Sequence, residues 1–191
     1  MLSYQHIYHA GGPADLHKHS ILCEVLDRLA RRCRALTYME THAGRGLYDL
    51  LSAEAAKTGE AAAGGWLAPG SAEKVPPRLR EIVRGLNAGA DAPLYPGSPM
   101  IAARLLRPSD FLHLMELHPQ EHAALKAAFA DDARVSVNRI DGYEGVLARC
   151  PPAPRDGLTL IDPSFELKDE YEQVAAFIDR LRNRWRDGAV M

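Results

Sequence analysis

The 191-residue chain has the composition of an ordinary globular domain, with 47% hydrophobic residues, 25% charged residues and a formal net charge of −2. A chain of this length can bury a substantial core, so one domain over residues 1–191 is expected. The near-neutral charge excludes a strong overall field for nucleic acid, and the apolar runs are too short to span a membrane. No membrane partner is therefore expected.

Cysteine usage and the first residues bear on the cellular compartment. Cys23, Cys33 and Cys150 are odd in number and widely spaced, which favours reduced thiols over a disulfide framework or a zinc site. Residues 1–6 lack the basic and apolar segments of a secretion signal. We therefore expect a cytoplasmic protein.

The N-terminal region predicts irregular structure over residues 4–14 and a helix over 15–34, where apolar residues keep helical spacing. His17, Lys18 and His19 fall at the start of this helix, where backbone amides and the helix dipole favour anions. A metal site formed by nearby histidines is the alternative. Their spacing matches no known zinc pattern, so no metal is expected.

The next segment has the pattern of a nucleotide-binding turn. A strand over 35–39 is predicted to run into a turn containing Gly44 and Gly46, and a helix is expected over 47–56. Such a unit begins the nucleotide sites of α/β folds, because glycine lets the backbone approach the ligand. The third glycine of the dinucleotide fingerprint is missing, so NAD is not expected.

Residues 52–92 are rich in alanine, glycine and proline and contain one amphipathic stretch, 78–86. We interpret them as a small helical insertion subdomain. Their composition suits a mobile lid or a substrate arm, and it equally suits a plain surface excursion.

The second half of the chain alternates helices and strands. Ser98 is predicted to cap a helix that has Pro99 in its first turn and runs to about residue 106. Further strands are expected over 111–115, 134–138 and 158–161, with helices over 120–130, from 142 to 150, and over 169–186. This alternation predicts a Rossmann-like α/β fold, a mostly parallel sheet covered by helices on both faces.

Polar residues follow two of these strands at the edge where open α/β sheets bind ligands. Glu116 ends the strand over 111–115 and is placed to accept hydrogen bonds from ribose hydroxyls. Asp141 and Gly142 follow the strand over 134–138, where a carboxylate and a backbone amide can hold an adenine edge.

The strand over 158–161 ends on Asp162 and Pro163, and Phe165 follows three positions after the aspartate. Because proline cannot donate to a sheet ladder, Asp162 is placed at the carboxyl end of the strand. This arrangement suits an exocyclic amine of a nucleobase. Asp162 and a backbone carbonyl can accept its hydrogens while the Phe165 ring stacks on the base.

The Asp-Pro-Ser-Phe tetrad resembles the Asp-Pro-Pro-aromatic tetrad of amino-methyltransferases that modify adenine N6, from which Ser164 departs. The bland alternative is a strand followed by an ordinary Asp-Pro turn. A larger set of motifs decides between them. In order along the chain these are Met1-Leu2-Ser3-Tyr4, His9-Ala10-Gly11, Ala14-Asp15, Lys18-His19, Thr41-His42-Ala43-Gly44, Tyr95-Pro96-Gly97-Ser98-Pro99, Glu116-Leu117-His118-Pro119, Asp141-Gly142 and Ile161-Asp162-Pro163.

Together these motifs resemble the bacterial 23S ribosomal RNA adenine-N6 methyltransferases that use S-adenosylmethionine. The resemblance implies 23S ribosomal RNA as partner, S-adenosylhomocysteine as product and no metal. It implies that Asp162 is catalytic, and that Tyr4, Lys18, Pro163 and Phe165 engage the substrate. The cofactor-binding residues that it implies are His19, His42, Ser98, Glu116, Asp141, Gly142 and Asp162.

Two other classes of function stay open at this point. One is a module that binds S-adenosylmethionine or RNA without catalysis, suggested by Ser164 and by the abrupt end of the chain. The other is a DNA adenine-N6 or small-molecule amino-methyltransferase with the same tetrad.

The resemblance also implies further strands after residue 191, so a C-terminally truncated chain is expected. Without them, the strand that ends at Asp162 is predicted to have an unpaired edge and an uncovered apolar surface. The full-length form is expected to be a monomer.

Overall fold

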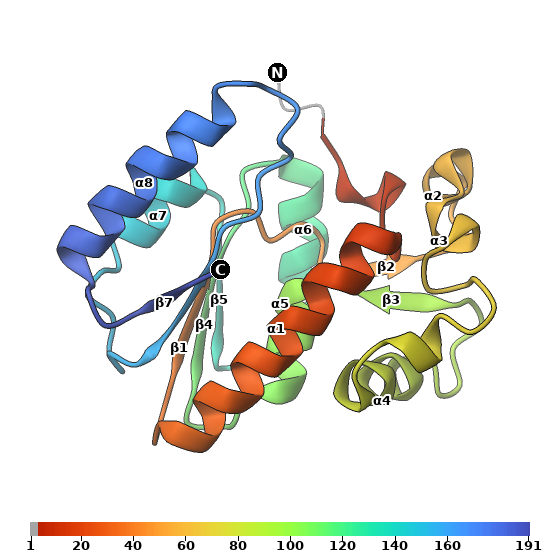
Figure 1. The fold of residues 1–191 in the computed structure, drawn as a ribbon, viewed down its shortest axis with the longest axis horizontal. Helices are drawn as coiled ribbons and strands as arrows, with labels where there is room; N and C mark the ends of the chain where they lie inside the picture. The colour runs from red at the N-terminus through yellow and green to blue at the C-terminus, as the bar shows by residue number, and fades with distance from the viewer. Residues whose placement is uncertain (1–3) are drawn as a thin grey trace.

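The computed structural model describes residues 4–191 (Figure 1), so Met1-Leu2-Ser3 of the first motif lie outside the described residues. Its centre is a five-stranded sheet of order β5-β4-β1-β6-β7, in which every neighbouring pair is parallel. The strands are β1 (Thr37–Glu40), β4 (Phe111–Met115), β5 (Val135–Asn138), β6 (Gly157–Leu160) and β7 (Ala189–Val190). The predicted Rossmann-like architecture is confirmed.

Helices cover both faces of this sheet (Figure 1). One face carries α1 (Pro13–Arg32), α5 (Ser98–Leu105) and α6 (Pro119–Ala128), and the other carries α7 (Gly142–Leu147) and α8 (Glu170–Arg184). Helix α1 begins two residues earlier than predicted, and a short 3-10 helix, η1 (His6–Tyr8), lies within the segment predicted to be irregular. Helices on both faces are required because a parallel sheet buries both of its surfaces.

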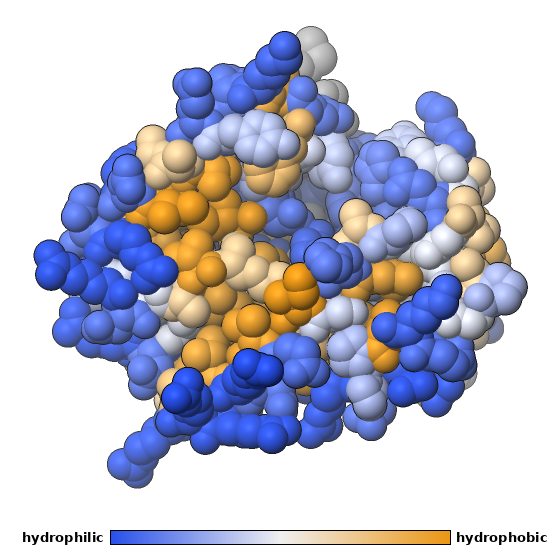
Figure 2. Space-filling model, viewed as in Figure 1, coloured by the Kyte–Doolittle hydropathy of each residue, from blue (hydrophilic) through white to orange (hydrophobic). Residues whose placement is uncertain are grey.

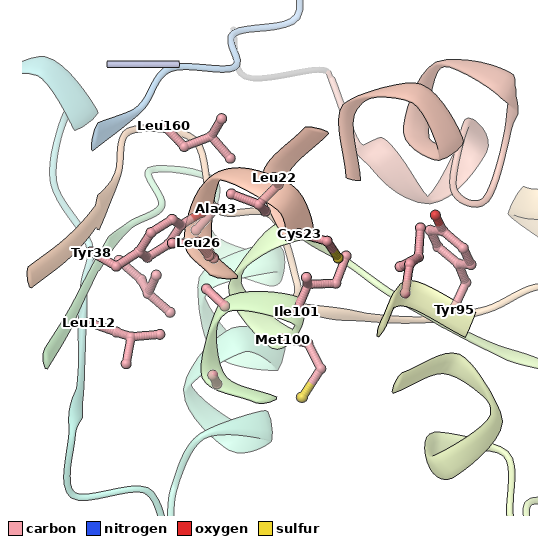
Figure 3. Packing of buried hydrophobic residues seen from close by; sticks show 14 of the residues in the cluster. Leu22, Cys23, Leu26, Tyr38, Ala43, Tyr95, Met100, Ile101, Leu112 and Leu160 are labelled. Atoms are coloured by element: carbon pink, nitrogen blue, oxygen red, sulfur yellow. The ribbon is translucent and has the colours of Figure 1, made fainter. Parts of the chain in front are cut away.

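The two-residue period of the strands divides the core into two clusters. Tyr38 of β1 packs with α1 and α5, whereas its neighbour Met39 packs with α7 and α8. Likewise Leu114 and Met115 of β4 face opposite sides. Figure 3 shows the first cluster, in which Leu22 and Leu26 of α1 lie against the sheet residues Tyr38, Leu112 and Leu160. Successive side chains alternate across a strand, so each apolar strand supplies both layers.

The helix predicted directly after the glycine turn is wrong over its first residues. Instead, β2 (Leu47–Asp49) pairs antiparallel with β3 (Leu94–Pro96), and the helix α2 begins only at Ala53. Two glycines with positive φ, Gly44 and Gly46, turn the chain away from the sheet. The partner strand lies beyond the insertion, and local periodicity gives no sign of so distant a partner.

The β2–β3 pair forms the base of the segment over 52–92. The segment contains α2 (Ala53–Thr58), α3 (Glu60–Ala63), η2 (Ala72–Lys74) and α4 (Pro77–Leu86). The amphipathic stretch predicted over 78–86 corresponds to α4, whose Leu79 and Val83 are buried in the main core. The insertion is therefore packed onto the same core as α1 and α5.

The unpaired edge predicted for the strand before Asp162 is also wrong. After α8, residues Ala189–Val190 form β7, which pairs parallel with β6 and continues the sheet. Gly188 makes this return possible, because a Cβ at that position would lie 2.4 Å from the Trp185 ring. Apolar side chains nevertheless gather on the surface between α1 and α8 (Figure 2). Within residues 4–191, none of the helices combines the length and apolar character that a membrane crossing requires.

Close backbone contact between β6 and β1 gives a test of this packing. A Cβ added at Gly157 would lie 1.9 Å from the Thr37 carbonyl oxygen, whereas one at Gly85 on α4 would meet nothing within 4 Å. Gly157→Ala should therefore lower the free energy of unfolding by about 2–4 kcal/mol. The matched control Gly85→Ala should raise it by up to about 1 kcal/mol, because alanine favours a helix. Urea denaturation measures both, and equal effects of the two variants would contradict the packing described here.

Candidate active site

A cleft of about 990 Å³ opens at the carboxyl ends of β1, β4 and β6. This is the edge at which open α/β sheets bind ligands. Every residue to which the sequence assigns a role lines the cleft: Tyr4, Lys18, His19, His42, Ser98, Glu116, Asp141, Gly142, Asp162, Pro163 and Phe165. The structure thus brings all of them together, while their individual roles stay predictions.

An ion pair crosses the floor of the cleft. The Lys18 ammonium on α1 lies 2.5 Å from Oδ2 of Asp162 and 3.2 Å from Oδ1 of Asp15. Burial disfavours the charged ammonium, but the two carboxylates outweigh burial and raise the pKa of Lys18 above its usual range. Lys18 therefore remains a cation and is no candidate for a general base.

Asp15 is the most connected carboxylate of the cleft. It is 2% exposed, accepts a hydrogen bond from the Gly11 backbone amide at 2.9 Å, and faces His6 Nε2 at 2.9 and 3.0 Å. Burial alone would raise its pKa, yet the charge and hydrogen bonds of His6, together with Lys18, hold the pKa of Asp15 far below its usual range. Asp15 is therefore a buried anion.

One ring nitrogen of His19 is buried without a hydrogen-bond partner among the described residues. Its ring is 1% exposed and its Nδ1 lies 3.0 Å from the Tyr95 hydroxyl, whereas Nε2 has no hydrogen-bond partner among the described residues. Burial lowers the pKa of His19 to about 3, so the ring is neutral. A buried nitrogen of this kind needs a partner, and a ligand in the cleft can supply one.

Ser98 does not cap its helix as predicted. Gly97 holds the N-cap position of α5, and the Ser98 hydroxyl instead donates to the Glu40 carboxyl at the end of β1. The Tyr38 hydroxyl donates to the other Glu40 oxygen at 2.8 Å. Glu40 has no exposed surface, and burial raises its pKa to about 8. A buried carboxyl needs donors more than the open end of a helix needs a cap, which explains the correction.

Glu116 holds the glycine turn that follows β1. Its Oε2 accepts from the Gly44 amide at 2.8 Å and its Oε1 from the His118 amide at 2.7 Å. Burial raises the pKa of Glu116 above its usual value. Each oxygen keeps a second lone pair, which can accept a hydrogen bond from a ligand hydroxyl.

The start of α7 closes another side of the cleft. Asp141 caps this helix by accepting from the Glu144 amide at 3.0 Å. A Cβ at Gly142 would lie 1.9 Å from the Thr41 carbonyl oxygen, so only glycine allows α7 to approach β1 so closely. The neighbouring His42 has its Nδ1 2.8 Å from the Thr41 hydroxyl, and burial lowers the pKa of His42.

The segment after Asp162 places an aromatic ring at the rim. Phe165 is 40% exposed, has a φ of 55° and packs against Tyr171, with ring centroids 4.8 Å apart. The Ser164 hydroxyl donates to the Glu170 carboxylate at 3.3 Å and so joins the loop to α8. A side chain therefore makes the link at the position where the resembled tetrad has its second proline.

Tyr4 also lines the cleft. Its hydroxyl lies 2.9 Å from His6 Nδ1, and its ring stacks on His9 with an interplanar angle of 7°. Burial raises the pKa of Tyr4 to about 12, so the phenol stays protonated. Hydrogen bonds thus run continuously from Tyr4 through His6 to Asp15.

The sequence-based assignment omitted His6, Asp15 and Glu40. The spacing of Asp15 and Lys18, which are three residues apart and so lie on one face of α1, was the available signal for Asp15. Nothing local distinguished Glu40 from an exposed acid at a strand end. Over residues 4–191, no group of three or more His, Cys, Asp or Glu is arranged to hold a metal ion.

Comparisons with known proteins agree with the resemblance described above. Residues 33–191 match the family model described as "RsmJ: Ribosomal RNA large subunit methyltransferase D, RlmJ". Ribosomal RNA large subunit methyltransferase J of Escherichia coli (strain K12) is 38% identical over 194 residues, which span 98% of this chain and 68% of that protein. The protein of the same name from Haemophilus influenzae (strain ATCC 51907 / DSM 11121 / KW20 / Rd) is 41% identical over 192 residues, with the same two coverages.

A solved structure is similar over the same extent. The crystal structure of a protein from Legionella pneumophila str. Philadelphia 1 superposes with a TM-score of 0.82 at 35% identity. The superposition covers 95% of this chain and 68% of that one. The fold and the sequence comparisons thus agree over nearly the whole chain.

The buried Glu40 carboxyl gives a prediction for pH dependence. Its pKa is about 8 in the folded chain, against an ordinary value of 4.5 for a glutamate in water, so the folded chain holds a proton that the unfolded chain releases. The resulting stability is fully present below pH 4.5 and is lost as the pH rises through 8. Glu40→Gln cannot ionise, so its pH profile should be flatter.

We expect the difference in the free energy of unfolding between Glu40→Gln and the parent to grow toward pH 8, where it should be on the order of 5 kcal/mol. Chemical denaturation at a series of pH values measures it. The exposed control Glu73→Gln should follow the parent. A Glu40→Gln profile parallel to that of the parent would show that Glu40 titrates as an ordinary surface acid.

Proposed function

The chain belongs to the family of ribosomal RNA large subunit methyltransferase J, and on that premise we propose that it transfers a methyl group from S-adenosylmethionine to the N6 amine of an adenine in 23S ribosomal RNA. The observation that carries the proposal is the carboxylate of Asp162. It stands at the carboxyl end of β6, in the cleft, with one oxygen engaged by Lys18.

The chemistry of the amine explains why a carboxylate is needed there. The adenine N6 lone pair is delocalised into the ring, which makes the amine a poor nucleophile. Lys18 holds Oδ2 of Asp162, so Oδ1 is the oxygen that accepts a hydrogen bond from the amine. With a backbone carbonyl near Pro163 as second acceptor, this bond localises the lone pair on nitrogen and orients it for in-line attack.

The remaining part of the cleft fits S-adenosylmethionine. When bound, this cofactor supplies a methyl group on a positively charged sulfur and leaves as S-adenosylhomocysteine. The neutral, unpartnered His19 Nε2 suits a carboxylate acceptor. The spare lone pairs of Glu116 suit ribose hydroxyls, and Asp141 with the amide of Gly142 suits the adenine edge. His42 and Ser98 line the space between these groups.

The substrate side of the cleft fits an unpaired nucleobase. A base inside a duplex cannot reach Asp162, so the adenine must be unpaired or flipped out of its stack. Phe165 is 40% exposed, and Tyr4 lines the same cleft. We assign Phe165 to stacking on the target base, with Tyr4, Lys18 and Pro163 beside it.

Within this proposal residues 1–191 form one methyltransferase domain with residues 52–92 as an insertion. Glu60 of α3 lines the cleft and faces His9 Nδ1 at 2.7 Å. Contact between the insertion and the cleft supports a role in holding the substrate rather than a plain surface excursion.

Asp162→Asn tests the proposal, because it keeps the shape of the side chain and replaces the charged acceptor with an amide. Methyl transfer should fall by at least about 100-fold in single turnover, while RNA binding changes little, since the lost interaction strengthens as the amine becomes tetrahedral. As a comparison, Phe165→Ala should weaken RNA capture by roughly 1–3 kcal/mol. Phe165→Tyr should be tolerated.

The assay uses labelled methyl donor at saturation, with RNA affinity measured separately. A near-normal single-turnover rate for Asp162→Asn would overturn the mechanism. Parent protein that binds S-adenosylmethionine and RNA without transfer would favour a binding module, the class of function left open by Ser164.

A further inference from the structure

Asp15 is a buried carboxylate of the cleft that lies on a helix, whereas Glu116 and Asp162 follow the ends of strands. It lies in the first turn of α1, lines the cleft and is 2% exposed. Removing a carboxylate from water is costly unless charged partners and hydrogen bonds compensate. The partners here are the Gly11 amide, the His6 ring and the Lys18 ammonium. Two of these side chains line the cleft, so the cost of burial is tied to the site.

Two carboxylates share one lysine. The Lys18 ammonium lies 3.2 Å from Asp15 and 2.5 Å from Asp162, with the neutral His19 ring beside Asp15 at 3.8 Å. An ammonium group has three protons, so it can donate to both carboxylates at once. Without Asp15, Lys18 would have Asp162 as its one anionic partner and would be free to cover both of its oxygens. The substrate amine would then have to compete with Lys18.

Asp15 also sets the charge of this part of the cleft. Asp162 and Lys18 together are neutral, and Asp15 adds a second carboxylate, whose remaining partners are the His6 ring and the Gly11 amide. A positively charged sulfonium bound near Asp162 is favoured by such a charge. The demethylated product carries a neutral thioether at the same place and gains nothing from it.

We propose that Asp15 is a positioning residue of the methyl-transfer site. It holds Lys18 to one oxygen of Asp162, which leaves the other for the amine, and it favours the charged methyl donor over the neutral product. This inference rests on the proposed function, since it assigns Asp15 a part in that same reaction. A purely structural role, capping the Gly11 turn, is the alternative.

The test compares the parent with Asp15→Asn and with Asp27→Asn, a control on the same helix outside the cleft, where Asp27 pairs with Arg31. Affinities for S-adenosylmethionine and S-adenosylhomocysteine are measured by calorimetry at pH 8, and thermal melts report folding. Asp15→Asn should bind the product within about threefold of the parent but the donor roughly tenfold more weakly. Its single-turnover rate at saturating donor should fall at least about tenfold. Asp27→Asn should match the parent in both affinities and in the single-turnover rate.

Lys18→Met keeps the proposal testable if Asp15→Asn does not fold. Removing the cation leaves both anions in place, so the preference for donor over product should rise about threefold or more. A folded Asp15→Asn with the parental preference and rate would overturn the proposal, as would an unchanged preference in Lys18→Met. Failure of the proposed function would look different, because the parent itself would transfer no methyl group whatever the affinities are.

Discussion

The ion pair between Lys18 and Asp162 is the interaction on which the site depends. It joins the first helix to a strand end 144 residues later in the chain. On one side it fixes the acceptor carboxylate, and on the other it is fixed by the buried Asp15. The N-terminal residues are thereby part of the cleft, because hydrogen bonds connect Tyr4 through His6 to the Asp15 carboxylate.

The sheet supplies the frame that makes this pair possible. Parallel strands bring the residues after β1, β4 and β6 to one edge. Glycines set how closely the surrounding segments approach, most clearly at Gly142 against the Thr41 carbonyl. Buried carboxyls then fix the loops, with Glu116 binding the Gly44 amide and Glu40 binding Ser98. The cleft is thus built from backbone contacts and carboxyl groups.

Local pattern predicted β1, β4, β5 and β6, the main helices and the position of Asp162, because each follows from periodicity or from a proline that ends a strand. The cleft residues followed from motifs in the sequence. What failed has a common cause, since the partners are distant in the chain. The β2–β3 pair joins residues on either side of the insertion, Ser98 finds Glu40 58 residues away, and β7 returns to β6 after a whole helix. Asp15 shares a helix face with Lys18, but its significance comes from Asp162, which lies far away in the sequence.

Identification of the methylated nucleoside tests the central claim most directly. The chain is incubated with methyl-labelled S-adenosylmethionine and unmethylated 23S ribosomal RNA, with DNA and free adenosine as parallel substrates, and each product is digested to nucleosides. The account predicts label in the RNA as N6-methyladenosine, with little in DNA or free adenosine. Label in another nucleoside, or in DNA or free adenosine in preference to RNA, would contradict it, as would bound donor without transfer to any substrate.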